Sequence, residues 1–551
     1  MKYRLLVLLS LCLSAPLCLN AQSEDQFEDD PFAAQQNSMP RARRGTSGWQ
    51  PAGYANQQDM VNAMLNAKIR RSLKYRFESV GVLGNGLNAP FWTTANRQGL
   101  SSVEKSNGYM RYGMFGEMLL PSTFGVKYGM DLGLGAGLQE NWFVQQLYID
   151  LDWKCLGLSI GMKERSCELV NCELGSGGLT WSGNSSPIPQ IRAGIPQFVR
   201  LGFLGNWVAL KGHVAYGLFT DNKWRSRNGG SYTDGIMFHS KDVFFKVGDK
   251  DRFPLEATIG LEMYAMFGGT MHNRSFSPGD PVFESYDLPH DLKACWKALL
   301  PFNKAGEQTK QNGNTLGSWH LSLDWTADEW RVRAYYEHFY EDHSSLLGIE
   351  YKADADGNKG FVRYGMKRNW FDGLWGLEIN FPQEMPVRNL VLEFMNTKGQ
   401  CGAVYKPKNV PLAEGVDGRD GMYNHEIYDS YSMNGYTIGN PVLLSPVYNN
   451  FGNQRLLSNR VNMFHVGIDG GLGNRIDYQL KCSVTRHWGT YELPFDSVRS
   501  ILSGMASAYW LAGKDYSWKI GLSYAFDRDD SLWLGNNDGV MVSIVKSWKI
   551  L

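Results

Sequence analysis

Apolar and polar residues alternate with a period of two along most of the chain, from about Lys74 onward. In the segment 146–153, for example, each of Leu147, Ile149 and Leu151 is followed by a polar or amphipathic residue. The same alternation is clear in residues 375–381, 477–485 and 518–526. Because successive side chains of a strand point to opposite faces, each segment is predicted to be a strand with one apolar and one polar face.

The predicted strands are long. Runs such as 142–154, 331–342 and 515–527 exceed the ~5–6 residues of an ordinary strand and reach the ~9–11 residues of a membrane-spanning strand. No helical stretch in the body of the chain is apolar enough to span a bilayer, so closure into a ring is the remaining way to pair the backbone in lipid. The chain also ends on an alternating segment around Val540, as ring closure requires. We predict an all-β fold, a transmembrane antiparallel β-barrel of roughly 16–18 strands.

Several stretches break the alternation and are expected to form small helical elements and long inserted loops. Helical spacing marks residues 57–72 and 494–509. It also marks residues 291–300, which lie within a connection, 272–314, that is too long for a turn. Long connections in barrels are normally extracellular loops or plugs, so we expect these segments at one end of the barrel.

The N-terminus has the order of a secretory signal peptide. A basic segment over residues 1–4 precedes an apolar run, and Ala21 is a small residue at which cleavage would occur. A retained N-terminal anchor is the alternative, although the run is shorter than the roughly 20 residues of a spanning helix. A lipoprotein signal fits less well, because Leu17 beside Cys18 is not small. We therefore expect a signal peptide (1–21), a periplasmic arm with a short helix (22–73) and an outer-membrane barrel (74–551).

The amino-acid composition limits the kinds of partner that the chain could bind. The 55 basic and 55 acidic residues balance, which leaves no electrostatic argument for binding nucleic acid. Aromatic residues make up 13% of the chain and there are 61 glycines, as expected for interfacial girdles and bent strands, although a large soluble all-β protein could share both. Cys167 and Cys172 are close enough to form a local disulfide, and two free thiols are equally compatible with the sequence.

Enzymatic signatures are weak. The sequence contains no nucleophile elbow, phosphate-binding loop or paired-histidine zinc motif. The most metal-like grouping comprises Glu337, His338, Glu341, Asp342 and His343. Its two histidines, however, would point to opposite faces of a strand. Lumen carboxylates could pair for glycosidic chemistry, although solvation of a wet interior is the simpler interpretation. These carboxylates are Asp150, Asp152, Glu378 and Glu393. We expect no catalysis, no metal and no cofactor.

The most informative segment runs from Gly175 to Trp224. Pro187 and Pro189 form a Pro-x-Pro pair that cannot donate ladder hydrogen bonds, so this stretch should be a loop folded inward or lying at a rim. An aromatic ring covers the apolar side of a sugar, while amides and a guanidinium meet its hydroxyls. The candidate ligand residues are therefore Trp181, Asn184, Gln190 and Arg192. The alternative is that the loop only packs the lumen.

The chain resembles a known family, the Wzi-type capsule assembly proteins of the outer membrane. The resemblance covers most of the chain and is most specific over residues 161–224. Each matching piece is short, so the specificity comes from the order and spacing of the pieces. The pieces are Ala89-Pro90-Phe91-Trp92, Asn96-Arg97-Gln98-Gly99, Gly161-Met162-Lys163, Gly175-Ser176-Gly177, Ser182-Gly183-Asn184, Pro187-Ile188-Pro189-Gln190, Lys211-Gly212, Tyr216-Gly217, residues 221–224, Tyr428-Asp429-Ser430-Tyr431 and Gly439-Asn440-Pro441. The resemblance implies an 18-stranded barrel with helical elements at the periplasmic side and a lectin-like role in retaining capsular polysaccharide.

Three functional hypotheses follow. The first is an outer-membrane barrel that binds capsular or surface polysaccharide and helps to attach or assemble it, with polysaccharide and membrane lipid as partners. The second is a porin-like channel for sugars or other small solutes. The third and weakest is a barrel hydrolase, for which no arrangement of nucleophile and base is recognisable. Plugging loops and lumen aromatics favour the first, because an open pore would gain little from them.

Overall fold

The computed structural model describes residues 70–550 apart from 121–123, 206, 251, 277–278, 300–312, 342–349, 354–358, 364–370, 383, 401–420, 450–451, 514 and 532. The expected signal peptide and nearly all of the expected arm lie outside the described residues. The first strand begins at Arg70, so the last three residues of the helix expected over 57–72 are strand, and the barrel starts slightly earlier than Lys74.

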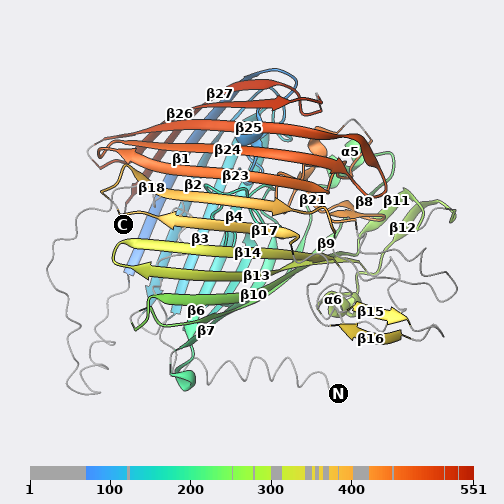
Figure 1. Cartoon of the computed structure of the whole chain (residues 1–551), viewed down its shortest axis with the longest axis horizontal. Helices are drawn as coiled ribbons and strands as arrows, with labels where there is room; N and C mark the ends of the chain where they lie inside the picture. Colours follow the sequence, from blue (N-terminus) through green and yellow to red (C-terminus); the bar gives the residue numbers. More distant parts are fainter. Residues whose placement is uncertain are drawn as a thin grey trace.

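Eighteen antiparallel strands form one closed sheet, which confirms the predicted barrel (Figure 1). Each strand pairs with its neighbours in ring order, and β1 closes the ring by pairing with both β2 and β27. The strands are β1 (Arg70–Asn85), β2 (Ser106–Leu120), β3 (Phe124–Ala136), β4 (Trp142–Trp153), β5 (Leu156–Met162), β6 (Gln190–Arg200), β7 (Val208–Leu218), β9 (Met237–Val247), β10 (Leu255–Phe267), β13 (Asn314–Ala327), β14 (Trp330–Glu341), β17 (Gly373–Asn380), β18 (Val387–Asn396), β23 (Val461–Leu472), β24 (Ile476–Gly489), β25 (Pro494–Ala512), β26 (Trp518–Asp529) and β27 (Asn537–Lys549).

Smaller elements occupy the connections. They are α4 (Phe91–Thr94), η1 (Gly202–Leu204), α5 (Asn222–Asn228), β8 (Tyr232–Asp234), β11 (Thr270–Arg274), β12 (Phe283–Asp287), α6 (Leu292–Leu299), β15 (Glu350–Ala353), β16 (Lys359–Arg363), β19 (Asn424–His425), β20 (Asp429–Ser430), β21 (Ser432–Met433), β22 (Tyr436–Thr437) and η4 (Pro446–Tyr448). The helix expected over 291–300 is therefore present as α6. Among the described residues no helix is long and apolar enough to cross a membrane.

The two ends of the barrel differ. Connections of two or three residues, such as 154–155 and 328–329, join strands at the end where β1 begins and β27 ends. The long connections, such as 163–189 and 397–460, share the opposite end. In barrels of this kind short turns face the periplasm and long loops face outward, so we call the two ends the inner end and the outer mouth. Helices α4, α5 and α6 lie in connections at the outer mouth, whereas the resemblance implied helices at the periplasmic side.

The wall faces follow the predicted alternation. Outward Leu147, Phe464 and Leu522 are 57%, 64% and 59% exposed, while inward Gln146 and Ser523 are buried. An outward apolar band is what a wall in contact with lipid requires. Exposed tryptophans lie near the inner end of several strands, as an interfacial girdle would. They are Trp153, Trp325, Trp330, Trp510 and Trp518.

The helix expected over 494–509 is wrong, because these residues belong to β25. The apolar residues that suggested a helix are also compatible with a strand; they are Val498, Ile501, Leu502 and Met505. Ile501 and Met505 face inward and are buried, while Val498 is exposed on the other side. β25 pairs with β24 over residues 499–510 and with β26 over residues 501–512. The ladder hydrogen bonds offered by two neighbouring strands override a local helical spacing.

Candidate functional site

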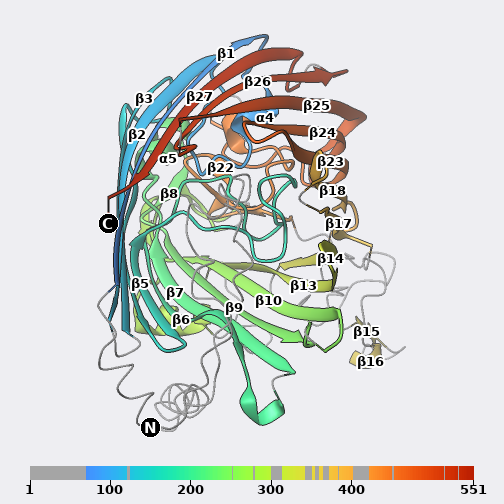
Figure 2. The ribbon, with the colours of Figure 1, turned by 90° about the vertical axis from the view of Figure 1, so that its left-hand side faces the viewer.

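Segments from three connections fill the barrel just below the outer mouth (Figure 2). They are residues 86–105 between β1 and β2, 163–189 between β5 and β6, and 421–449 between β18 and β23. We call these three segments the plug. Their large side chains, including Trp92 and Leu179, are almost fully buried and belong to the main hydrophobic cluster of the protein. The loop around Pro187 is therefore folded inward, which is one of the two placements that the sequence left open.

The first two plug segments are joined by backbone and amide hydrogen bonds. The Asn96 side chain donates to the Ser176 carbonyl at 2.9 Å, and the Gly99 amide donates to the Asn184 carbonyl at 3.2 Å. Gly99 has φ +72°, and a Cβ there would lie 2.2 Å from Ser186 Oγ. Only glycine fits this position, because it tolerates the left-handed conformation and lacks a side chain.

The second and third plug segments are joined in the same way. The Ser182 hydroxyl donates to the Gly439 carbonyl at 2.7 Å, and the Asn440 amide donates to Ser176 Oγ at 3.1 Å. Tyr431 donates from its hydroxyl to a carbonyl of the second segment at 3.0 Å. Several short motifs that carry the sequence resemblance thus meet in space, and their shared role in this chain is to lock the plug together.

Wall carboxylates hold the plug to the barrel. The two carboxylate oxygens of Glu337 accept the amides of Leu179 at 2.8 Å and Thr180 at 2.9 Å. Glu393 accepts the amide of Ser176 at 2.7 Å. Further contacts of this kind are Phe91 N to Asp527, Tyr423 N to Glu341 and Asn171 Nδ2 to Glu378. A carboxylate bonded to backbone N–H groups makes a strong charge-assisted contact.

The carboxylates proposed from the sequence as a possible acid–base pair are all engaged in other contacts. Glu378 and Glu393 bind the plug, as described above. Asp150 forms an ion pair with Lys163 at 2.8 Å, and Asp152 forms one with Lys127 at 3.3 Å. These contacts fit the simpler interpretation, in which the groups stabilise a polar interior.

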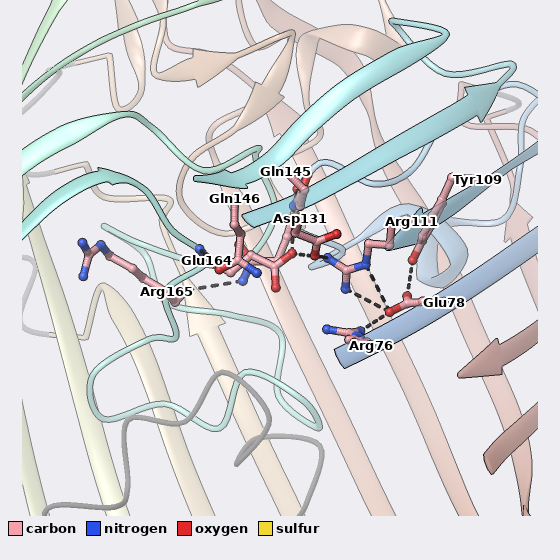
Figure 3. Close-up of polar contacts among 10 residues, drawn as sticks. Arg76, Glu78, Tyr109, Arg111, Asp131, Gln145, Gln146, Glu164 and Arg165 are labelled. Carbon is pink, nitrogen blue, oxygen red and sulfur yellow. Dashed lines mark hydrogen bonds and ion pairs between the residues drawn. The ribbon is translucent and has the colours of Figure 1, made fainter. Parts of the chain in front are cut away.

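A buried charge network connects the plug to the wall (Figure 3). Arg111 on β2 reaches Glu78 at 3.0 Å, Asp131 at 3.1 Å and Glu164 at 2.6 Å, and its side chain is only 5% exposed. Arg76 makes a second contact with Glu78. Glu164 lies in the second plug segment, so this one guanidinium joins three adjacent strands to the plug. Such a network fixes geometry more than it adds stability, because burying five charged groups is itself costly.

The four ligand residues predicted from the sequence lie in two places. Trp181 and Asn184 belong to the plug, where Trp181 stacks on Tyr264 with ring centroids 5.9 Å apart. The Asn184 amide is fully used, since it donates to Thr437 and to Ser445. Gln190 and Arg192 begin β6 and face the lumen.

Gln190 is buried, whereas the Arg192 side chain is 18% exposed. Arg192 lies 3.9 Å from Asp242, so it is paired on the wall and keeps some contact with the lumen. Of the four predicted residues, Arg192 therefore has the most accessible polar group.

A cavity of about 230 Å³ opens at the outer mouth. Four connections that are distant in sequence line it, with Glu104, Gln139, Trp224, Asn228 and Tyr436 among the lining residues. Glu104 and Gln139 are exposed, while Trp224 packs against Gly435, where any Cβ would collide with the indole. We call this the mouth cavity. The sequence did not predict it, because no single stretch contains its aromatic and amide groups.

A second cluster missed by the sequence lies in the wall. Glu262, His320 and Glu337 offer ligand atoms that all lie within 4.8 Å of one another, an arrangement that could hold a metal ion. Each group already has a protein partner: His320 contacts Glu262 at 3.2 Å, and Glu262 accepts the hydroxyl of Tyr264 at 2.9 Å. The same His320 nitrogen is 3.9 Å from Glu337, whose oxygens accept the plug amides instead. In the grouping predicted from the sequence, Glu337, His338 and Glu341 lie on β14, where the neighbours Glu337 and His338 point to opposite faces. Asp342 and His343 lie outside the described residues.

The segment 163–189 also contains a disulfide. Cys167 and Cys172 are bonded, with Cα atoms 6.0 Å apart, so of the two arrangements compatible with the sequence the bridge is confirmed. Among the cysteines of the described residues, Cys295 and Cys482 are free thiols.

No family model and no curated protein matches the sequence. Solved structures do match. One is Wzi of Escherichia coli, described as an outer-membrane protein involved in group 1 capsule assembly and a carbohydrate-binding β-barrel. It is 11% identical, with 88% of this chain and 86% of that chain covered and a TM-score of 0.49. OprD of Pseudomonas aeruginosa is 9% identical, with 87% and 96% covered and a TM-score of 0.42. A BenF-like porin from Pseudomonas fluorescens Pf-5 is 7% identical, with 87% and 99% covered and a TM-score of 0.44.

Proposed function

We propose that this outer-membrane barrel binds capsular or related surface polysaccharide at its outer mouth and holds it at the cell surface without chemical turnover. The observation that carries the proposal is the mouth cavity, which sits directly on an interlocked plug. Trp224 and Tyr436 supply aromatic surface to its wall, and Gln139 and Asn228 supply amides. Aromatic faces and amides are the groups that contact the apolar side and the hydroxyls of a sugar.

The plug holds the lining groups of the mouth cavity in place before a ligand binds. Its three segments are cross-linked by hydrogen bonds and anchored to wall carboxylates, as in the contacts of Glu337 and Glu393. Groups held in place by such contacts lose little further freedom when a ligand binds, so weak individual sugar contacts add up more effectively.

The residues predicted from the sequence take different roles in this proposal. Trp181 and Asn184 support the cavity from below by packing and bonding within the plug. Gln190 and Arg192 are proposed contacts for a glycan segment that passes into the lumen. A double substitution of Trp181 and Arg192 would therefore mix a structural effect with a binding effect.

The test combines binding and retention. Surface polysaccharide purified from the producing cells is titrated onto the purified protein in detergent, using Gln139→Ala with Asn228→Ala as the cavity variant. Lys250→Ala, an exposed change at the inner end, is the matched control. We expect weaker binding and more shed polysaccharide for the cavity variant alone. Unchanged binding and retention in the cavity variant, with normal barrel assembly, would contradict the proposal.

The second candidate function is a channel for small solutes. It is favoured by the charged lumen side of the wall, where Arg111, Lys127 and Arg192 face the interior. Single-channel recording in planar bilayers tests it. Measurable conductance, together with normal polysaccharide retention by cells that lack the protein, would support transport instead.

A further inference from the structure

Helix α6 lies against the outside of the barrel wall, in contrast to the plug. Its buried residues Ala294 and Ala298 pack on Ala265 and Phe267 of β10. Ala265 and Phe267 alternate along β10 with Tyr264 and Met266, which belong to the cluster in the barrel interior. Because neighbouring strand residues point to opposite faces, Ala265 and Phe267 point outward and α6 covers them from outside (Figure 1).

Two wall residues bind backbone carbonyls of α6. The Tyr216 hydroxyl donates to the carbonyl of Cys295 at 2.8 Å. Lys241 of β9 donates to the carbonyl of Ala298 at 3.2 Å and also to that of Leu299. The final carbonyls of a helix have no partner within it and carry partial negative charge, so the Lys241 ammonium stabilises this end. The helix is therefore fixed to the wall.

The side of α6 that faces away from the wall is apolar. Leu292 is 89% exposed and Trp296, one turn later, is 38% exposed. Lys293 is exposed on one flank, with Lys297 one turn further along. A short helix with aromatic and aliphatic residues on one side and lysines beside them is typical of a segment that lies in a membrane interface.

The strand geometry gives the height of α6 on the wall. Leu255 of β10 pairs with the exposed Trp325, which belongs to the girdle at the inner end. Ala265, under α6, is ten residues further along β10. At ~3.4 Å per residue and a tilt of ~40°, ten residues rise by ~26 Å, which matches the ~25 Å height of the apolar band. Helix α6 therefore lies at the outer edge of the band, at the level of the lipid headgroups.

We propose that α6 is an interfacial anchor for the outer leaflet. Leu292 and Trp296 insert among the upper parts of the acyl chains, and Lys293 and Lys297 bind the phosphate groups of anionic lipids. The inference depends on the outer-membrane location included in the proposed function, and it is independent of polysaccharide binding. An apolar helix surface and adjacent lysines at one height together match an anionic lipid headgroup layer.

The experiment measures hydrogen–deuterium exchange of the α6 backbone amides in the full-length protein. The protein is reconstituted in vesicles of phosphatidylcholine alone, or of equal parts phosphatidylcholine and phosphatidylglycerol. We expect slower exchange in the anionic vesicles, by about fivefold for each engaged lysine. Lys293→Glu with Lys297→Glu should remove the difference, whereas Lys250→Glu at the inner end should preserve it. Leu292→Ser with Trp296→Ser should speed exchange in both vesicles.

Two results would overturn the inference. One is equal exchange of the α6 amides in both vesicle types for the unchanged protein. The other is the same slowing produced by inorganic phosphate in neutral vesicles, which would assign the lysines to a soluble anion. Heat-modifiable migration on gels reports barrel insertion in every sample, so a failure of the membrane location would be seen separately from a failure of α6.

Discussion

Replacing Arg111 by methionine is the sharpest test of how the plug is joined to the wall. The substitution keeps most of the side-chain volume and removes the guanidinium. It leaves Asp131, which is fully buried, without its ion-pair partner, and it removes the 2.6 Å contact to Glu164 of the plug. Glu78 keeps its contact with Arg76. The main loss therefore falls on one wall carboxylate and on the plug.

The expected cost is set by burial. Removing one partner of a buried ion pair typically destabilises a protein by ~3–5 kcal/mol, because the remaining charge is left uncompensated. A matched pair in the same lumen is Lys127 with Asp152, whose side chains are 23% and 30% exposed at 3.3 Å. Water screens a pair of this kind, so Lys127→Met should cost only ~0–1 kcal/mol.

The assay is urea unfolding in lipid vesicles, followed by tryptophan fluorescence, with limited proteolysis of the plug segment 163–189 in parallel. Arg111→Met should lower the unfolding midpoint clearly more than Lys127→Met and should expose the plug to cleavage. Arg111→Lys should fall between them, since it keeps the charge and loses the forked geometry. Equal midpoints for the two methionine variants would refute the reasoning, because they would mean that Arg111 is as well solvated as Lys127.

Other predictions concern the wall and the plug. Leu147 is outward and pairs with Met130 at the middle of its strand. Leu147→Arg should therefore lower the free energy of unfolding in vesicles by ~2–4 kcal/mol, and Glu117→Arg on the lumen side should lower it far less. Gly99→Ala should increase plug proteolysis without changing barrel migration on gels, because its Cβ would collide with the second plug segment. Burial raises the pKa of the Glu173 carboxyl to about 7, so protonation favours the folded plug and plug stability should fall as pH rises from about 4.5 towards 7. Glu173→Gln should abolish that fall in protease protection, and an unchanged pH profile in the variant would contradict the assignment to this carboxyl.

The strands of the barrel wall could be predicted from the sequence because the alternation of apolar and polar residues is a local pattern. A strand places neighbouring residues on opposite faces, so the order Leu147, Tyr148, Ile149 already specifies which side chains meet lipid and which meet the lumen. The length of each run then distinguishes a membrane wall from a soluble sandwich. The same locality explains the correct prediction of α6. It also explains the failure at 494–509, where one set of apolar residues satisfies both periods and only the neighbouring strands decide.

The candidate site depended on contacts between distant segments. Asn184 looked like a sugar ligand because an amide on an inward loop is chemically suited to one, but its donors bind Thr437, 253 residues away. The pairing of Glu337 with Leu179 links residues 158 apart, and no periodicity encodes it. Several motifs that carry the family resemblance lie in the plug, but the sequence did not show that these motifs contact one another.

The sequence by itself therefore determined the barrel, its faces and the break in the strand pattern around Pro187, since strand alternation and the missing proline donors act within a few residues. Tertiary structure decided which carboxylates hold the plug, where Glu104, Gln139 and Trp224 converge, and that α6 lies outside the wall. The physical reason is the closed ring. Joining β1 to β27 brings loops hundreds of residues apart to one mouth, where their polar groups must be satisfied by one another.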